Sequence, residues 1–351
     1  GKSMFNCSKE ITSYHNDEVT LPQSERTEMR DRRNSNRDRV KKGLRDNGKP
    51  AAEEFVSQGS YAMRTMVQHK AKDYDIDDGV YFAKDDLGGK TSLQARQMVR
   101  DAVDDGKFNT PPEVRKNCVR VYYEKGYHVD LPVYRRVEEY DSIGNVIDFY
   151  ELATSDWKRS DARDVTAWFD KENQAQSPDA DNGRQLRRIT RFIKKFSQSR
   201  DSWKSKIGSG FMITKLVTEK FVANLNREDT SLYDTMKAIR DRLESDLVVK
   251  HPVTPDSTIT SGDADPKAKF LKEKLSEAIT DLDVLLASDC TRKQAMKAWD
   301  KVFNTTYFTD KLEKEGDEGN KSGAAAAGGL LSSGYSSPSN PVKKDGGGRY
   351  A

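Results

Sequence analysis

The stretch "GSYAMRTMVQHKAKDYDIDDGVYF", residues 59–82, places three aspartates around one isoleucine in a segment otherwise typical of a buried strand. Successive side chains of a strand point to opposite faces, so we expect Asp75 and Asp77 to share one face while Ile76 packs on the other. Asp78 falls on the core-facing side, where we expect it to end the strand or form a bulge rather than to bind a metal. Two carboxylates on one face repel each other unless cations lie between them, and such oxygen ligands suit Mg²⁺ bound together with substrate phosphates.

Two simpler interpretations of the acidic segment fit the sequence less well. A calcium loop that starts at Asp75 would need glycine at its sixth position and glutamate at its twelfth, where Val80 and Asp86 stand. A surface acidic turn is disfavoured because the flanking Tyr74 and Phe82 are strongly β-prone. The aspartate pair therefore indicates metal-dependent phosphate chemistry.

Nucleotidyl transfer with paired metal ions needs one more carboxylate, beside the attacking hydroxyl. The stretch "RVYYEKGYHVDLPVYRR", residues 120–136, predicts a hairpin in which Asp130 lies on the polar face of an apolar strand. Asp130 therefore fits the position that completes the second metal site and favours deprotonation of the hydroxyl. His128 shares the face of Asp130, and we expect it to be structural rather than a ligand contact.

The phosphates of an incoming nucleotide need donors that approach closely. Gly59 and Ser60 supply an unhindered backbone and a hydroxyl. A single Gly-Ser pair is weak evidence for a nucleotide site. Gly-Ser followed after fourteen residues by Asp-Ile-Asp, and later by Asp130, is a much more specific pattern.

The organisation of the chain changes near its middle. Strands mixed with a helical stretch within residues 92–106 predict an α+β domain over residues 1–155, and periodic apolar residues predict a mainly helical domain over residues 156–314. Residues 315–351 are rich in glycine and serine and predict a flexible, disordered tail.

A long basic helix is predicted near the N-terminus. A helix-start box at Thr20 and Gln23 begins it and Asn47 marks its end. Its basic residues between Arg30 and Arg45 form either a solvated face or a surface for phosphates or a partner, and the sequence leaves both open.

Composition excludes several classes of protein. The 351 residues carry a net charge of only +3, so attraction to nucleotides must come from local clusters of Lys and Arg. The three cysteines, Cys7, Cys118 and Cys290, fit neither a disulfide framework nor a zinc site. No apolar run predicts a membrane span or a signal peptide, and we expect a cytoplasmic protein.

Taken together, the Gly-Ser pair, "DIDDGVYF" and "HVDLPVY" resemble the polymerase-β-like nucleotidyltransferases, and in particular the bacterial cGAS/DncV-like group. "SDWKRSDARDVTAWFDK", "GRQLRRITRFIKKF" and "IGSGFMIT" are similar, in order and spacing, to the helical lobe of that group. The resemblance covers about residues 50–310. It implies a bilobed enzyme that binds two nucleotides and Mg²⁺.

The resemblance also implies roles for individual residues. Asp75 and Asp77 would hold two Mg²⁺ ions, with Mn²⁺ as a substitute, Asp130 would complete the second site, and Ser60 would hold the donor triphosphate. From the helical lobe, Lys194 and Ser209 would bind the triphosphate, and Ser160 would contact the acceptor base. Alternatively, Lys194 belongs to the solvated face of an amphipathic helix. The family's Gly-Ser-Phe is replaced here by Gly-Ser-Tyr, which leaves base preference and linkage open.

The activity that the resemblance implies is synthesis of a cyclic oligonucleotide second messenger from ATP, GTP or other NTPs, with 3′,3′-linked GMP-AMP as the leading product. Such a product would activate a downstream effector in anti-phage signalling. A ubiquitin-ligase-like enzyme would join Ala351, at the end of "KKDGGGRYA", to a target, unless the tail is simply an unstructured end. Two other hypotheses stay open: a nucleotidyltransferase with an RNA or protein acceptor, and an inactive nucleic-acid-binding module that uses the basic helix.

Overall fold

The computed structural model describes residues 3–322, and within them the chain divides into two compact units. The sheet unit comprises residues 22–64 and 71–169, and the helical unit comprises residues 3–21, 65–70 and 170–322. We placed the boundary near residue 155 and the whole N-terminus with the sheet. The structure instead groups residues 3–21 and 65–70 with the helices, and it divides helix α5 (Ala162–Gln176) between the units.

The sheet unit contains one mixed sheet, which confirms the predicted α+β class. Strand β2 is parallel to β5 and β6, and the other pairs are antiparallel. The strands are β1 (Glu54–Gln58), β2 (Asp75–Ala83), β3 (Glu113–Val114), β4 (Val119–Tyr122), β5 (His128–Leu131), β6 (Val133–Tyr140), β7 (Val146–Ala153) and β8 (Trp157–Arg159).

Strand β2 lies at the centre of this sheet. Strands β5 and β6 pair one after the other along the same edge of β2 and keep the same register. Pro132 lies between them, and its carbonyl accepts a hydrogen bond from the Val80 N–H at 2.8 Å. Strand β1 takes the opposite edge, since Gln58 and Asp130 both lie opposite Asp77. Strand β4 pairs with β5, so the predicted hairpin is present, and β7 pairs with β6 and β8 with β7.

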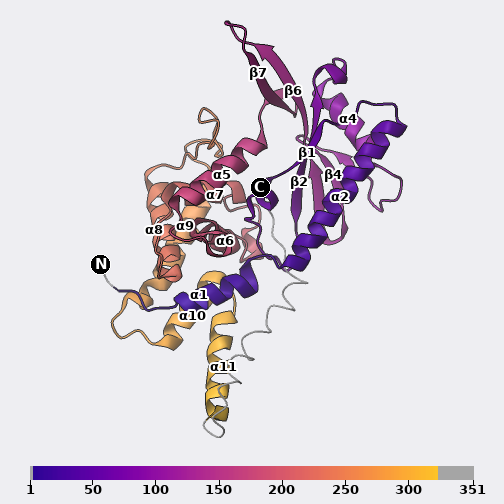
Figure 1. The fold of residues 1–351 in the computed structure, drawn as a ribbon. Coiled ribbons are helices and arrows are strands. Elements are labelled where there is room, and N and C mark those ends of the chain that lie inside the picture. Colours follow the sequence, from indigo (N-terminus) through magenta and orange to yellow (C-terminus); the bar gives the residue numbers. More distant parts are fainter. Residues whose placement is uncertain (1–2, 323–351) are drawn as a thin grey trace. The chain divides into compact units, whose positions relative to one another are not determined.

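Two helices, α2 (Gln23–Asp46) and α4 (Ser92–Val103), pack against each other and against one face of the sheet (Figure 1). A Cβ atom added to Gly43 of α2 would lie 1.9 Å from the carbonyl oxygen of Ala102 in α4, so only glycine permits this approach. Helix α4 lies within residues 92–106, where we predicted a helix. It begins with a capping box formed by Thr91 and Gln94.

Helix α2 begins later than we predicted. Its N-cap is Pro22, with no side-chain capping bond, so the expected box at Thr20 and Gln23 is wrong. Its end is as predicted, with Asn47 as the C-cap and Gly48 at a φ of 66°.

Asp78 shows why this helix lies on the sheet. Its side chain is fully buried and accepts two hydrogen bonds from Arg37 of α2, from Nε at 2.7 Å and from Nη2 at 2.6 Å. The expectation that Asp78 ends or bulges the strand is wrong, because β2 continues to Ala83. A buried carboxylate is tolerated within a strand when a guanidinium satisfies both of its oxygens.

Other arginines of the basic run also contact the sheet unit. Arg33 donates to Ser57 Oγ at 3.0 Å, and the Arg32 guanidinium lies over the rings of Tyr123 and Tyr127, at 4.4 and 4.0 Å from their centroids. These side chains serve packing, so the basic run is neither wholly solvated nor wholly available to phosphates.

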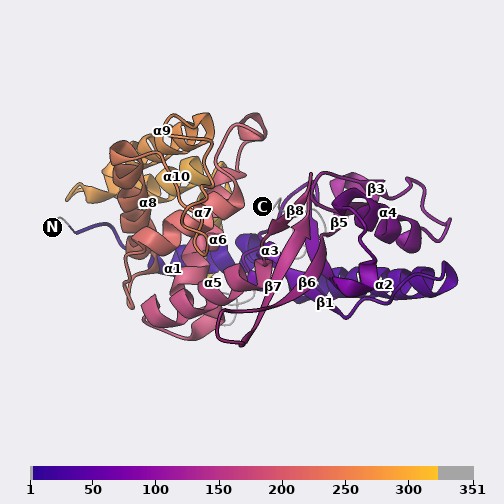
Figure 2. The same cartoon turned by 90° about the horizontal axis from the view of Figure 1, so that it is seen from above.

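The helical unit confirms the predicted helical second half. Helices α8, α9 and α10 lie together in this unit (Figure 2). Its long helices are α6 (Gln185–Ser197), α7 (Gly210–Lys220), α8 (Glu228–Ser245), α9 (Pro266–Asp281), α10 (Arg292–Phe303) and α11 (Tyr307–Ser322), and α1 (Ser8–Tyr14) with η1 (His15–Val19) joins them from the N-terminal side.

Helix α11 continues past Glu315, where we predicted the tail to begin, and reaches Ser322. The rest of the predicted tail, with Ala351, lies outside the described residues. Within residues 3–322, no helix has both the length and the apolar character needed to span a membrane.

We predict that Arg37→Ala lowers the free energy of unfolding by about 2–4 kcal/mol, because it leaves the Asp78 carboxylate buried without a partner. Burial already raises the pKa of Asp78 even with Arg37 beside it. Urea denaturation would measure the change. The control is Arg30→Ala, whose side chain is 54% exposed and lies only within 4.0 Å of Asp31, and it should change stability by less than about 0.5 kcal/mol. Equal losses in both variants would contradict the role of the buried pair.

Candidate active site

Parallel pairing of β2 with β5 gathers the predicted carboxylates on one face of the sheet. Asp75 lies opposite His128, and Asp77 lies opposite Asp130. Residues directly opposite each other in neighbouring strands point to the same face, which here is the face away from Asp78. The sheet register therefore brings Asp75, Asp77 and Asp130 together, and their catalytic roles stay predictions.

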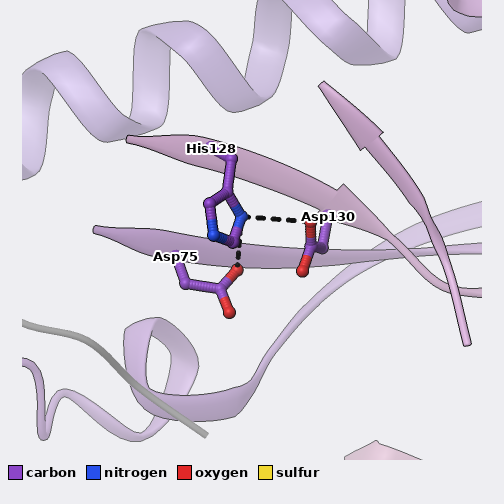
Figure 3. A group of neighbouring side chains, drawn as sticks. All are labelled: Asp75, His128 and Asp130. Atoms are coloured by element: carbon purple, nitrogen blue, oxygen red, sulfur yellow. Dashed lines mark hydrogen bonds and ion pairs between the residues drawn. The ribbon is translucent and has the colours of Figure 1, made fainter. Parts of the chain in front are cut away.

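His128 lies between two of these carboxylates (Figure 3). Its Nδ1 atom is 3.1 Å from Asp130 Oδ1 and 3.2 Å from Asp75 Oδ1. The contact with Asp130 has hydrogen-bond geometry, whereas Asp75 Oδ1 is buried and has no well-aligned hydrogen bond within the described part of the chain. We expected His128 to be structural, and the structure brings it into direct contact with the predicted metal ligands.

Arg120 of β4 holds Asp130 from the other side. Its Nε and Nη2 atoms donate to Asp130 Oδ1 and Oδ2 at 2.9 and 3.0 Å. Such a two-point contact fixes the plane of the carboxylate. Sequence reasoning missed Arg120, although its place opposite Asp130 in the predicted hairpin is the signal that could have found it.

The electrostatics of the cluster follow from burial of several like charges. Burial, and then the neighbouring Asp75 and Asp130, raise the pKa of Asp77 well above its usual range. Burial likewise raises the pKa of Asp75, and Asp130 adds to this. Burial would also raise the pKa of Asp130, but hydrogen bonds from His128 and Arg120 outweigh it and hold that pKa below its usual range. Asp75 and Asp77 thus resist ionisation in the absence of a cation, and a bound cation would favour their charged forms.

The predicted phosphate-binding turn lies against the same face. Gly59 has a φ of 64°, and a Cβ atom added to it would lie 2.6 Å from Asp77 Oδ2. Only glycine allows the backbone this close to the carboxylate. Ser60, the next residue, is buried, and its Oγ has no hydrogen-bond partner within residues 3–322. A buried hydroxyl without a partner is unusual in proteins, and it fits a group that binds a ligand.

The residues of the cluster fit a divalent cation. Asp75, His128 and Asp130 each offer one ligand atom, and these atoms lie within 4.8 Å of one another. The predicted set contained Asp77 in place of His128, and Asp77 lies beside this group in the sheet. Carboxylate oxygens are hard ligands of the kind that Mg²⁺ and Mn²⁺ take.

The structure places Ser160 away from the carboxylates. Ser160 follows β8, and its N–H donates to the Tyr150 carbonyl in β7 at 3.0 Å. Tyr150 pairs with Arg136 of β6, and Arg136 pairs with Ala83 of β2. Ala83 is the last residue of β2, whereas Asp75 is the first. The base contact that we expected of Ser160 stays a prediction.

The remaining predicted residues belong to the helical unit. Lys194 of α6 is buried and donates from Nζ to Thr65 Oγ1 at 3.4 Å. Burial, and then Arg191, lower the pKa of Lys194 to about 7. Ser209 is the N-cap of α7, where its Oγ accepts a hydrogen bond from the Met212 N–H at 3.2 Å. Lys194 is thus not on a solvated helix face, and Ser209 has a structural task. The triphosphate contacts of both residues stay predictions.

Residues 53–134, which include all of the carboxylates, match the family described as "Cyclic GMP-AMP synthase DncV-like, nucleotidyltransferase domain". The chain is 26% identical over 238 residues to a cyclic GMP-AMP synthase of Escherichia albertii. That match covers 64% of this chain and 49% of the relative, so the chain matches about half the length of this relative.

Solved structures show the same fold. A CD-NTase of Bradyrhizobium diazoefficiens, CdnG in complex with GTP, has a TM-score of 0.66 and 13% identity, over 88% of this chain and 98% of that one. DncV of Vibrio cholerae, a cyclic AMP-GMP synthase in complex with a linear intermediate, has a TM-score of 0.63 and 18% identity, over 86% and 96%.

The fold and the carboxylate site therefore define a nucleotidyltransferase. Within that class, residues 53–134 match the DncV-like nucleotidyltransferase domain, and the chain has the fold of the DncV-like CD-NTases.

We predict that Asp77→Asn stabilises the protein in EDTA at pH 7.5, because the amide cannot ionise in the buried site. The folded-state pKa of Asp77 is raised, so the wild-type protein should lose stability as the pH rises from about 4 toward neutral, and the variant should lose less. Chemical denaturation at several pH values would measure this. Asp86→Asn, in an exposed turn after β2, is the control and should leave the profile unchanged. A destabilised Asp77→Asn protein would show that Asp77 stabilises the fold instead.

Proposed function

We propose that the protein uses Mg²⁺ to join nucleoside triphosphates into a cyclic oligonucleotide second messenger, with release of pyrophosphate at each step. The observation that carries the proposal is the gathering of Asp75, Asp77 and Asp130 on one buried face, beside the Gly59-Ser60 turn, in a DncV-like domain. Three buried carboxylates on one face are costly to ionise unless cations lie between them.

Each residue has a task in this reaction. Asp75 and Asp77 would hold two Mg²⁺ ions, for which Mn²⁺ can substitute, and Asp130 would share in the second site. The metal ions supply charge that neutralises the phosphates and the attacking oxygen. Ser60 would donate its free hydroxyl to the donor triphosphate. Arg120 and His128 fix the Asp130 carboxylate, so it is positioned beside the acceptor hydroxyl.

The bond changes follow from these positions. The ribose hydroxyl oxygen of the acceptor forms a bond to the α-phosphorus of the donor, the bond to the β-phosphate oxygen breaks, and pyrophosphate leaves with its electron pair. The hydroxyl proton passes to Asp130 and then to water. A second reaction of the same kind, after the linear product rebinds with its free hydroxyl at Asp130, would close the ring.

We propose a 3′,3′-linked GMP-AMP ring, made from ATP and GTP, as the leading product. Two observations support this product: the relative is a cyclic GMP-AMP synthase, and the V. cholerae protein binds a linear intermediate. The product would activate a cyclic-nucleotide effector in anti-phage signalling. Lys194 and Ser209 would contact the triphosphate and Ser160 the acceptor base. Ala351 would be the residue that a ubiquitin-ligase-like enzyme conjugates.

The other two hypotheses have less support. A nucleotidyltransferase with an RNA or protein acceptor would use the same carboxylates, but the relative that the chain matches is a cyclic GMP-AMP synthase. An inactive nucleic-acid-binding module would need the basic helix α2 to be available, yet Arg32, Arg33 and Arg37 contact the sheet unit.

We predict a phosphatase-resistant cyclic product when the purified protein is incubated with all four NTPs and Mg²⁺ or Mn²⁺. Mass spectrometry would identify its bases. The product should fall at least about 100-fold in the Asp75→Asn, Asp77→Asn variant, because metal binding is lost. It should persist in Asp85→Asn, Asp86→Asn, a matched pair of exposed aspartates that follows the same strand. A linear product attached to added RNA, with no cyclic product, would favour the other acceptor class.

We predict that Ser60→Ala raises KM for the NTP by about 5- to 10-fold and leaves thermal stability unchanged, because Ser60 Oγ bonds to nothing in residues 3–322. Ser92→Ala is the matched control. Its Oγ donates to the Thr154 carbonyl at 2.8 Å, so this variant should lose stability and keep its KM. Steady-state kinetics and differential scanning fluorimetry measure both. A wild-type KM in Ser60→Ala would remove Ser60 from the nucleotide site.

A further inference from the structure

Strands β6 and β7 form a two-stranded ribbon that extends past the rest of the sheet (Figure 1). The last pairing of β6 with β2 is Arg136 with Ala83, but β6 and β7 stay paired as far as Tyr140 and Val146. A two-stranded ribbon is only marginally stable in water without something packed on it. The ribbon is therefore a place where a partner would be expected.

Exposed apolar side chains gather at the tip of this ribbon. Across the described residues, seven large hydrophobic side chains are exposed, and four of them lie within residues 140–147. These are Tyr140 (73% exposed), Ile143 (80%), Val146 (57%) and Ile147 (40%). Single exposed apolar residues are ordinary on protein surfaces, but a cluster of four marks an interaction site.

The outer edge of β7 has backbone groups available for another strand. Tyr150 accepts a hydrogen bond from the Ser160 N–H, so its backbone groups point away from β6, and those of Asp148 and Val146 point the same way. Strand β8 already pairs with this edge at Glu151 to Ala153. Across residues 3–322, no strand pairs with it at Val146 to Asp148.

The charge of the ribbon selects the partner. Residues 137–149 contain four acids, Glu138, Glu139, Asp141 and Asp148, and no Lys or Arg. Arg136, at its base, contacts both Glu138 and Asp148 as well as Glu53, so one cation serves three carboxylates. Two copies of this edge would bring like charges together, and a nucleic acid would be repelled. A basic protein segment is the complementary partner.

We propose that residues 146–148 of β7 bind an extended, basic segment of a partner protein, which adds to the sheet as an antiparallel strand. Val146 and Asp148 would each exchange backbone hydrogen bonds with it. Side chains directly opposite in an antiparallel pair share a face. The segment should therefore carry a Lys or Arg opposite Asp148, followed by two apolar residues opposite Ile147 and Val146.

The proposed surface is separate from the carboxylate site. Asp77 lies six residues before Ala83 along β2, and the ribbon extends four residues further along β6, from Arg136 to Tyr140. At 3.3 Å per residue the two sites are about 30 Å apart. A partner bound here would leave the carboxylates accessible, and the proposal does not depend on the reaction that they catalyse.

The test begins with a phage-displayed library of random seven-residue segments, flanked by Gly-Ser linkers and selected on the full-length protein. The enriched peptides should contain a basic residue followed by two apolar residues. Their affinities for the wild-type protein and for two variants would be measured by fluorescence anisotropy. Asp148→Asn removes the side-chain charge but keeps the backbone N–H. Asp148→Pro removes both. The Asp148 N–H points away from β6, and an edge strand tolerates proline at such a position.

Asp148→Asn should weaken binding by about 3-fold, and Asp148→Pro by at least about 30-fold, since a backbone hydrogen bond is lost as well. Asp85→Asn, an exposed aspartate of the same unit, should bind as the wild type does. A peptide N-methylated at the amide opposite Asp148 should lose binding to the wild-type protein, which keeps the test independent of how the proline variant folds. The proposal is overturned if no peptide is enriched, if enriched peptides are acidic, or if N-methylation and Asp148→Pro leave binding unchanged.

Discussion

The parallel register of β2 and β5 is the constraint on which the site depends. It places Asp77 directly opposite Asp130, and it places His128 opposite Asp75. Four titratable side chains thereby meet on one buried face, and three of them carry the same charge. A shift of one residue in this register would send one set of side chains to the other face and separate the cluster.

Neighbouring residues partly compensate for the repulsion between these carboxylates. Arg120 and His128 donate to Asp130, and together they hold its pKa low. Within residues 3–322, no arginine or histidine donates to Asp77 in this way, and burial raises the pKa of Asp77. The protein itself thus stabilises the ionised form of Asp130, whereas Asp77 gains most from a bound cation. Such compensation lets the folded protein carry an unfavourable site without a metal.

The two faces of β2 show two solutions to the burial of acids. On one face, Asp78 is neutralised permanently by Arg37 of α2, which fastens the helix to the sheet. On the other face, no arginine of residues 3–322 makes a two-point contact with Asp75 or Asp77, and the backbone at Gly59 lies against Asp77 instead. Alternation along a single strand thus separates a structural ion pair from the candidate active site by one residue.

The sequence by itself determined the local features. The spacing of Asp75 and Asp77 assigned both to one face, the β4 and β5 hairpin was predictable from its turn, and the helix within residues 92–106 followed from apolar spacing. Each of these depends on neighbours only a few residues away. Only the tertiary structure decided the pairing of Asp78 with Arg37, the contacts of His128 and the grouping of residues 65–70 with the helical unit. These features depend on segments that are distant in sequence. Packing and the need to satisfy buried charge bring those segments together, and local periodicity predicts neither of these two effects.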